Sequence, residues 1–174
     1  MKRVVRVLIF LLLGMALVGC GKHEYRQGVK QLEKGKYEEA VSHFEKAVEK
    51  EANVGDSYRG IGIARWELED YEGSGDAFLK ALENGSEETG TIYNFLGACM
   101  MKLDRPSEAA SYYEQGILQE GCSEEMLREM RFNMIAAYEA QGDYESAKAK
   151  LAEYVAAWPD DAQAVKEAEF LETR

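Results

Sequence analysis

The sequence predicts an all-α fold, an α-α solenoid of about four helix-turn-helix repeats followed by a C-terminal capping helix. One observation is a short segment that recurs at 35–40, 69–74, 104–109 and 142–147. The last residues of the four copies lie 34, 35 and 38 residues apart, and a period of this size is typical of solenoids built from one stacked supersecondary unit. The other observation is that apolar residues follow helical spacing throughout, whereas no segment alternates with a period of two.

Each copy reads as a helix, a short turn and a second helix. The second helix carries a small residue, then an aromatic four positions later and another small residue three positions after that, which places all three on one stripe of a helix. The first helix carries a glycine twelve residues before that first small residue, at Gly28, Gly62 and Gly97. Small groups on both helices let their backbones approach closely. The repeats cover about 21–54, 55–88, 90–123 and 128–160, and residues 161–174 form an amphipathic helix through Val165, Ala168 and Leu171 that we expect to cap the last repeat.

These residues resemble the tetratricopeptide repeat, in which an aromatic, a Leu-Gly pair and alternating aromatic and small residues stand at fixed offsets. Copy three matches the pattern best, through Tyr93, Leu96, Gly97, Ala109, Tyr113 and Gly116. Copy four departs from it, with Ile135 in place of the glycine and Tyr154 in place of a small residue, and copy one has Gln27 in place of the leucine. The resemblance extends over about residues 22–160 and is specific for the fold, whereas about function it says almost nothing.

The first nineteen residues have the features of an export signal. Three basic residues, Lys2, Arg3 and Arg6, precede an uncharged run from Val7 to Val18 that is too short to span a bilayer. The run ends in Leu17-Val18-Gly19-Cys20, which resembles the lipobox of bacterial lipoprotein precursors. This resemblance implies that residues 1–19 are a signal peptide that is removed, that Cys20 is lipidated, and that 20–174 form a single domain. An ordinary signal peptide with an incidental cysteine is the alternative.

The expected location follows from this signal. Acyl chains on Cys20 would anchor the protein to the bacterial cell membrane, facing outside the cytoplasm, and two or more chains hold a protein firmly. Gly21 stands where many inner-membrane lipoproteins have Asp, so the outer membrane is expected if the organism is Gram-negative. Loss of the three basic residues of the signal changes the net charge from −11 to −14. An acidic body of this kind argues against a nucleic-acid partner.

The sequence gives little support to enzymatic chemistry. The two histidines, His23 and His43, belong to no catalytic pattern and are expected to be exposed on helices. We therefore predict a non-enzyme with no cofactor and no metal. Cys99 and Cys122 are candidates for a disulfide outside the cytoplasm, but their spacing does not decide whether they meet.

The tetratricopeptide resemblance also implies where a partner binds. In that family the first helices of the repeats line a concave groove, and the matching positions here give candidate contacts at Arg59, Ile63, Trp66, Asn94, Met101 and Phe132. Trp66 and Phe132 have an equally good alternative role as core residues. The basic clamp with which some family members hold a terminal carboxylate is absent, since its positions are occupied by Tyr25, Val29, Gly60, Thr91 and Phe95. An extended or helical peptide segment of a protein is the expected ligand.

A basic stripe begins two residues after Cys20. It consists of residues spaced four apart on the first helix, namely Lys22, Arg26, Lys30 and Lys34. The stripe is a possible contact for lipid headgroups. The favoured alternative is a solvated surface on which Glu24 and Glu33 dilute the charge.

Three functions compete. The leading prediction is a membrane-anchored lipoprotein that acts as a protein-binding adaptor or scaffold in the cell envelope. The second is an assembly or pilotin-type factor for secretion, pilus or outer-membrane components. The third is an accessory or sensor lipoprotein with a small-molecule pocket near Tyr93, Asn94 and Cys99.

Overall fold

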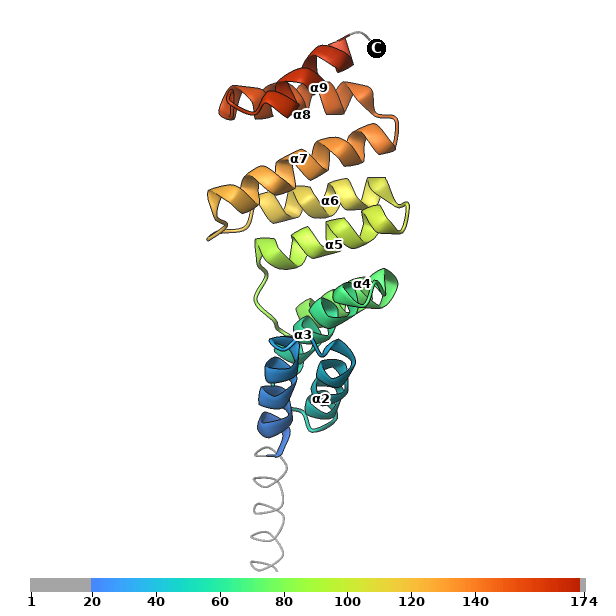
Figure 1. The fold of residues 1–174 in the computed structure, drawn as a ribbon, viewed down its shortest axis with the longest axis vertical. Helices are drawn as coiled ribbons and strands as arrows, with labels where there is room; N and C mark the ends of the chain where they lie inside the picture. Colours follow the sequence, from blue (N-terminus) through green and yellow to red (C-terminus); the bar gives the residue numbers. More distant parts are fainter. Residues whose placement is uncertain (1–19, 173–174) are drawn as a thin grey trace, which may run out of the picture. The chain divides into compact units, whose positions relative to one another are not determined.

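The computed structural model describes residues 20–172, and every regular element in this range is an α-helix. The predicted signal peptide, with Leu17, Val18 and Gly19 of the lipobox, lies outside the described residues. The chain forms two compact units, one ending at Glu87 and the other beginning at Glu88. Each is described by itself below (Figure 1), and the expected single domain 20–174 stays a prediction.

The first unit contains two helix-turn-helix pairs. A helix over residues 20–32 pairs with α2 (Tyr37–Glu49), and α3 (Val54–Glu67) pairs with α4 (Tyr71–Glu83). Helix α3 packs against both α2 and α4.

The second unit contains two further pairs and one additional helix. Its elements are α5 (Gly90–Lys102), α6 (Pro106–Ile117), α7 (Glu124–Ala140), α8 (Tyr144–Ala157) and α9 (Ala162–Glu172). Each packs against the next along the chain, and α5 also touches α7, the first helix of the following pair. The predicted all-α class of stacked helical repeats with a C-terminal helix is confirmed.

The turn inside every pair has the same backbone conformation. Gly35, Glu69, Asp104 and Gly142 all have positive φ, between 56° and 81°. Each stands five residues before the small residue that anchors its repeat. Glycine adopts this left-handed conformation without strain, whereas Glu69 and Asp104 carry a Cβ that disfavours it. The spacing of the repeat therefore requires the left-handed turn even at Glu69 and Asp104, where the residue type disfavours it.

The predicted glycines are the points where helices approach closely. A Cβ built on Gly62 would lie 2.9 Å from the ring of Phe78, and one built on Gly97 would lie 2.6 Å from the ring of Tyr113. Phe44 is held from two sides, because a Cβ on Gly28 would lie 2.7 Å from its ring and one on Gly60 only 2.5 Å away. These distances are shorter than real Cβ contacts, so the aromatic stripe packs directly on glycine backbone.

In the fourth repeat, different residues fill the contact between the first and second helices. Ile135 replaces the glycine of the first helix, and Leu151 replaces the aromatic of the second. Both are buried in one cluster with Tyr154, Ala164 and Leu171. Since Leu171 comes from α9 and is 1% exposed, this helix covers the last repeat as predicted.

Cys99 and Cys122 do not pair with each other. Cys99 is fully buried in α5, and the thiol of Cys122 lies 3.7 Å from the carbonyl oxygen of Gly116. Both are free thiols in the structure.

Candidate partner-binding surfaces

In the second unit, the first helices of the two pairs meet through side chains that include the predicted groove residue Asn94. The Asn94 amide on α5 donates a hydrogen bond of 3.1 Å to Glu129 on α7. One turn before each of these residues, Thr91 contacts the sulfur of Met126 at 3.8 Å. Side chains of α5 and α7 therefore meet here, and the Asn94 donor is already used within the protein, while its role in binding a partner stays a prediction. Met101 lies farther along α5 and is half-buried.

A hollow of about 400 Å³ opens beside Phe132 on the same surface. Glu125, Glu129 and Phe132 contribute one stripe of α7, because they are spaced four and three residues apart. The remaining lining comes from Arg128, Tyr154, Asp161 and Gln163. We refer to this site as the α7 hollow.

Phe132 forms part of the wall of this hollow while remaining half-buried. Its ring packs in a tilted arrangement on that of Tyr154, with centroids 5.6 Å apart, and Tyr154 packs in the same way on Trp158 at 4.8 Å. Phe132 thus packs on the buried Tyr154 and also lines the hollow, while its role in binding a partner stays a prediction.

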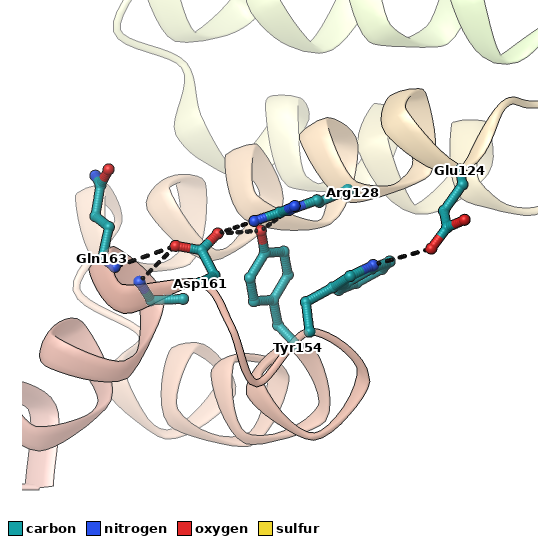
Figure 2. A network of polar contacts seen from close by, with 7 residues as sticks. Glu124, Arg128, Tyr154, Asp161 and Gln163 are labelled. Atoms are coloured by element: carbon teal, nitrogen blue, oxygen red, sulfur yellow. Dashed lines mark hydrogen bonds and ion pairs between the residues drawn. The ribbon is translucent and has the colours of Figure 1, made fainter.

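A polar network fixes the junction of α7, α8 and α9 at one side of the hollow (Figure 2). Arg128 lies 2.8 Å from one carboxylate oxygen of Asp161 and also donates to the Tyr154 hydroxyl at 3.0 Å. The Tyr154 hydroxyl in turn donates to the same Asp161 oxygen at 2.8 Å. The other Asp161 oxygen accepts from the backbone N–H groups of Gln163 and Ala164, which caps α9.

This network determines which charges the hollow presents. Arg128, followed by Tyr154, holds the pKa of Asp161 well below its usual range, and burial raises the pKa of Tyr154. The single guanidinium of the lining is thereby neutralised by Asp161. Glu125 and Glu129, the other two carboxylates of the lining, form no ion pair within residues 20–172, since the nearby Arg128 is paired with Asp161. The α7 hollow is therefore acidic.

In the first unit the predicted groove residues lie along α3. Arg59 makes an ion pair of 3.1 Å with Asp56 one turn earlier. Trp66 packs edge-on against Tyr71 at 5.1 Å and, like Ile63, is half-buried.

A second hollow, of about 490 Å³, lies at the start of α3. Its lining includes Asp56 and Arg59, together with the turn after α4 that contains Ser86. The Ser86 hydroxyl is buried and has no hydrogen-bond partner in the described chain.

The surroundings of Cys20 contain a contact that the sequence analysis missed. Lys50, the residue that follows α2, donates to the exposed Cys20 sulfur at 3.1 Å and to Glu24 at 3.2 Å. The other oxygen of Glu24 lies 2.8 Å from the His43 ring. His43 is consequently half-buried and partnered, so the expectation of an exposed histidine was wrong.

The basic stripe is exposed at all four positions, Lys22, Arg26, Lys30 and Lys34. The Arg26 side chain donates a local hydrogen bond to the carbonyl of Lys22. No acidic residue among 20–172 pairs with the stripe, and the carboxylate of Glu24 is directed to His43 and Lys50 instead.

Sequence reasoning missed most of the α7 hollow. It identified Phe132 but gave no role to Arg128 and Asp161. A signal was available, because Tyr154 is a large hydroxyl-bearing residue at a position that normally holds a small one, and Asp161 directly precedes the last helix. In residues 20–172 there is no group of three or more His, Cys, Asp or Glu side chains arranged to hold a metal ion. Within the same range, no helix is long and apolar enough to cross a membrane.

Comparison with known families identifies the repeats. One family model, described as a tetratricopeptide repeat, matches residues 25–89, and another with the same description matches residues 129–161. Together the two matches span more than half of the chain. No curated protein sequence matches the chain significantly.

Solved structures agree with this assignment at the level of the fold. YrrB, described as a tetratricopeptide repeat protein with an unusual peptide-binding site, is 24% identical, with a TM-score of 0.74 over 86% of this chain and 75% of YrrB. A MamA structure from Desulfovibrio magneticus RS-1 is 19% identical, with a TM-score of 0.73 over 88% of this chain and 84% of that one. PilW, described as a type IV pilus biogenesis factor, is 18% identical, with a TM-score of 0.63 over 88% of this chain and 69% of PilW.

Proposed function

Because the chain belongs to the tetratricopeptide repeat family, we propose that it is a lipid-anchored adaptor that holds a segment of another protein in the cell envelope. The α7 hollow carries the binding half of this proposal. It combines an aromatic wall, formed by Phe132, with carboxylates from α7 and from the turn before α9. An open hollow with an aromatic side chain and carboxylates in its lining favours a peptide segment over a small metabolite, because small-molecule sites are usually enclosed and mostly apolar.

Its structural relatives support the same class of ligand. YrrB is described as having a peptide-binding site. A shared fold at this level of identity does not transfer the ligand, so the argument for a peptide rests on the hollow itself.

The anchoring half of the proposal rests on the lipobox and on the position of Cys20. The Cys20 thiol is exposed in the described structure, with Lys50 as its neighbour. An acylated Cys20 would place helix 20–32 next to the membrane surface. The basic stripe on that helix would then face anionic headgroups, each residue contributing about 1 kcal/mol near such a surface.

Metabolic labelling with a radioactive fatty acid tests the anchor. We expect the full chain to incorporate label and to fractionate with membranes, and the Cys20→Ser variant to do neither. Cys122→Ser is the matched control, since it removes another free thiol at a distant position and should leave labelling unchanged. Equal labelling of wild type and Cys20→Ser would refute lipidation at this residue.

Crosslinking in intact cells, followed by mass spectrometry, tests the adaptor role. Phe132→Ala should lose the captured protein, whereas Phe170→Ala, which truncates a 49% exposed aromatic on α9, should retain it. Circular dichroism melting of both variants shows whether the fold is intact. Unchanged capture by a folded Phe132→Ala protein would contradict the adaptor proposal.

A second candidate function is an assembly factor for pilus, secretion or outer-membrane components. The likeness to PilW favours it over other specialised roles, although that likeness concerns the fold. In this case the captured protein would be a subunit of such an assembly. Crosslinked material without any such subunit would exclude this candidate while leaving the adaptor role in place.

A further inference from the structure

The α7 hollow has a charge that indicates what kind of peptide it accepts. Its lining contains three carboxylates, from Glu125, Glu129 and Asp161, and one guanidinium, from Arg128. Arg128 and Asp161 neutralise each other at 2.8 Å. The two carboxylates on α7 therefore set the net charge that a ligand meets.

Both carboxylates line the same hollow from one face of α7. Glu125, Glu129 and Phe132 lie on one stripe of the helix, so the aromatic ring comes directly after the two acids along the surface. Glu129 receives a hydrogen bond from Asn94, which holds its carboxylate in position without neutralising it. A cation placed here would lie near two carboxylates, which attract it, and near the aromatic ring of Phe132.

We infer that the α7 hollow binds a lysine or arginine side chain of an extended peptide segment in a partner protein. This inference rests on the proposed adaptor function and specifies the chemistry of its ligand. The aliphatic stem of such a side chain would pack on Phe132, while the charged end would lie between Glu125 and Glu129. Charge complementarity excludes acidic segments, since a carboxylate would meet two like charges.

Phe132 adds an aromatic wall to the hollow, on which the apolar part of a ligand side chain can pack. The ring is fixed by its contact with Tyr154, whose hydroxyl is itself held by Arg128 and Asp161. A rigid aromatic wall loses little entropy on binding, which favours recognition of a specific side chain.

Selection from a phage-displayed library of random dodecapeptides tests the inference. The full chain, in detergent micelles and immobilised through a C-terminal tag, is the target. We expect selected peptides to be enriched in Lys or Arg, and replacement of that residue by methionine to weaken binding about tenfold in fluorescence anisotropy. The isosteric double variant Glu125→Gln/Glu129→Gln should show a similar loss and should bind with less dependence on salt.

The matched control is Glu120→Gln/Glu169→Gln, which removes the same charge from two exposed positions of the second unit that do not line the hollow. It should bind the selected peptides like wild type. Equal loss in both double variants would overturn the inference, because it would show a general charge effect.

The remaining outcomes separate the inference from the proposed function. Peptides selected without basic residues, or bound equally by Glu125→Gln/Glu129→Gln, would overturn the inference and leave the adaptor role intact. Failure to select any peptide would count against both. A salt-sensitive dimer in sedimentation that is abolished by reversing the charges of the basic stripe would show a second copy of this chain as the occupant, which would also overturn the inference.

Discussion

Substitution of Gly60 by alanine tests whether helix propensity or core packing determines stability at this position, because the two effects change the free energy of unfolding in opposite directions. Gly60 lies within α3, where alanine is a better helix former by about 1 kcal/mol. Propensity alone therefore predicts that Gly60→Ala stabilises the protein. Packing predicts the opposite sign, because the new Cβ would lie 2.5 Å from two ring carbons of Phe44.

The expected magnitude follows from how far the Phe44 ring can move. Ordinary van der Waals contact begins at 3.4 Å, so the ring must retreat by about 0.9 Å from the new methyl group. The retreat is obstructed because Gly28 approaches the ring from the helix over residues 20–32, and Phe44 is only 1% exposed. Overpacking of a core of this kind destabilises by about 1–3 kcal/mol. After the gain in propensity is subtracted, we expect a net loss of about 1 kcal/mol, or about 2–4 °C in Tm.

Urea denaturation followed by circular dichroism measures this change, and a second variant reveals its cause. Phe44→Leu removes the ring, so Gly60→Ala in that background should be neutral or stabilising by up to about 1 kcal/mol. The double-mutant cycle should therefore show a coupling of about 1–3 kcal/mol between the two positions. An equal stabilisation by Gly60→Ala in both backgrounds would refute the reasoning.

Three further predictions concern the turns, the Asp161 network and the membrane surface. Glu69→Gly and Asp104→Gly each remove a Cβ from a residue in the left-handed conformation and should raise the free energy of unfolding by about 0.5–1 kcal/mol. Gly35→Ala adds a Cβ at the equivalent position and should lower the free energy of unfolding. A loss of stability in both glycine variants would contradict the turn assignment. Asp161 has a folded-state pKa below the ordinary value of 3.8, so its contribution to stability is present above that pH and is lost as the pH falls toward the lowered pKa. Urea titrations should consequently show Asp161→Asn destabilised at neutral pH, with the difference from wild type shrinking below pH 3.8; a constant difference would exclude the linkage. The Cys20→Ser variant, which cannot be acylated, should bind vesicles of phosphatidylglycerol more tightly than vesicles of phosphatidylcholine. Charge reversal of the basic stripe should remove this preference. Equal binding before and after charge reversal would favour the alternative in which the stripe is a solvated surface.

The repeated packing could be predicted from the sequence because it uses residues at a fixed spacing. Gly62 and Phe78, or Gly97 and Tyr113, are sixteen residues apart in each copy, and both pairs meet as the pattern implies. A glycine followed by an aromatic residue at the same spacing in successive repeats predicts that the ring packs on the glycine backbone. This prediction does not depend on which residues occupy the surface.

The site was less predictable because its contacts join positions that do not recur. Phe132 was identified from its repeat position, and it does line the hollow. Arg128, Tyr154 and Asp161 come from α7, α8 and the turn before α9, and no second copy of this set occurs in the sequence. The same reasoning explains the error at His43, whose partner Glu24 lies on a different helix.

The amino-acid sequence by itself determined the helical pairs, their period, the expected signal with Cys20, and the acidic composition. These properties depend on residue type and on spacing along the chain. Interactions between residues close in sequence are enough to define the helices, the turns and the apolar stripes. Only the tertiary structure decided that Asp161 neutralises Arg128 and that Glu125 and Glu129 are left to set the charge beside Phe132. Electrostatics depends on distances between side chains across helices, and those distances exist only after the helices have packed.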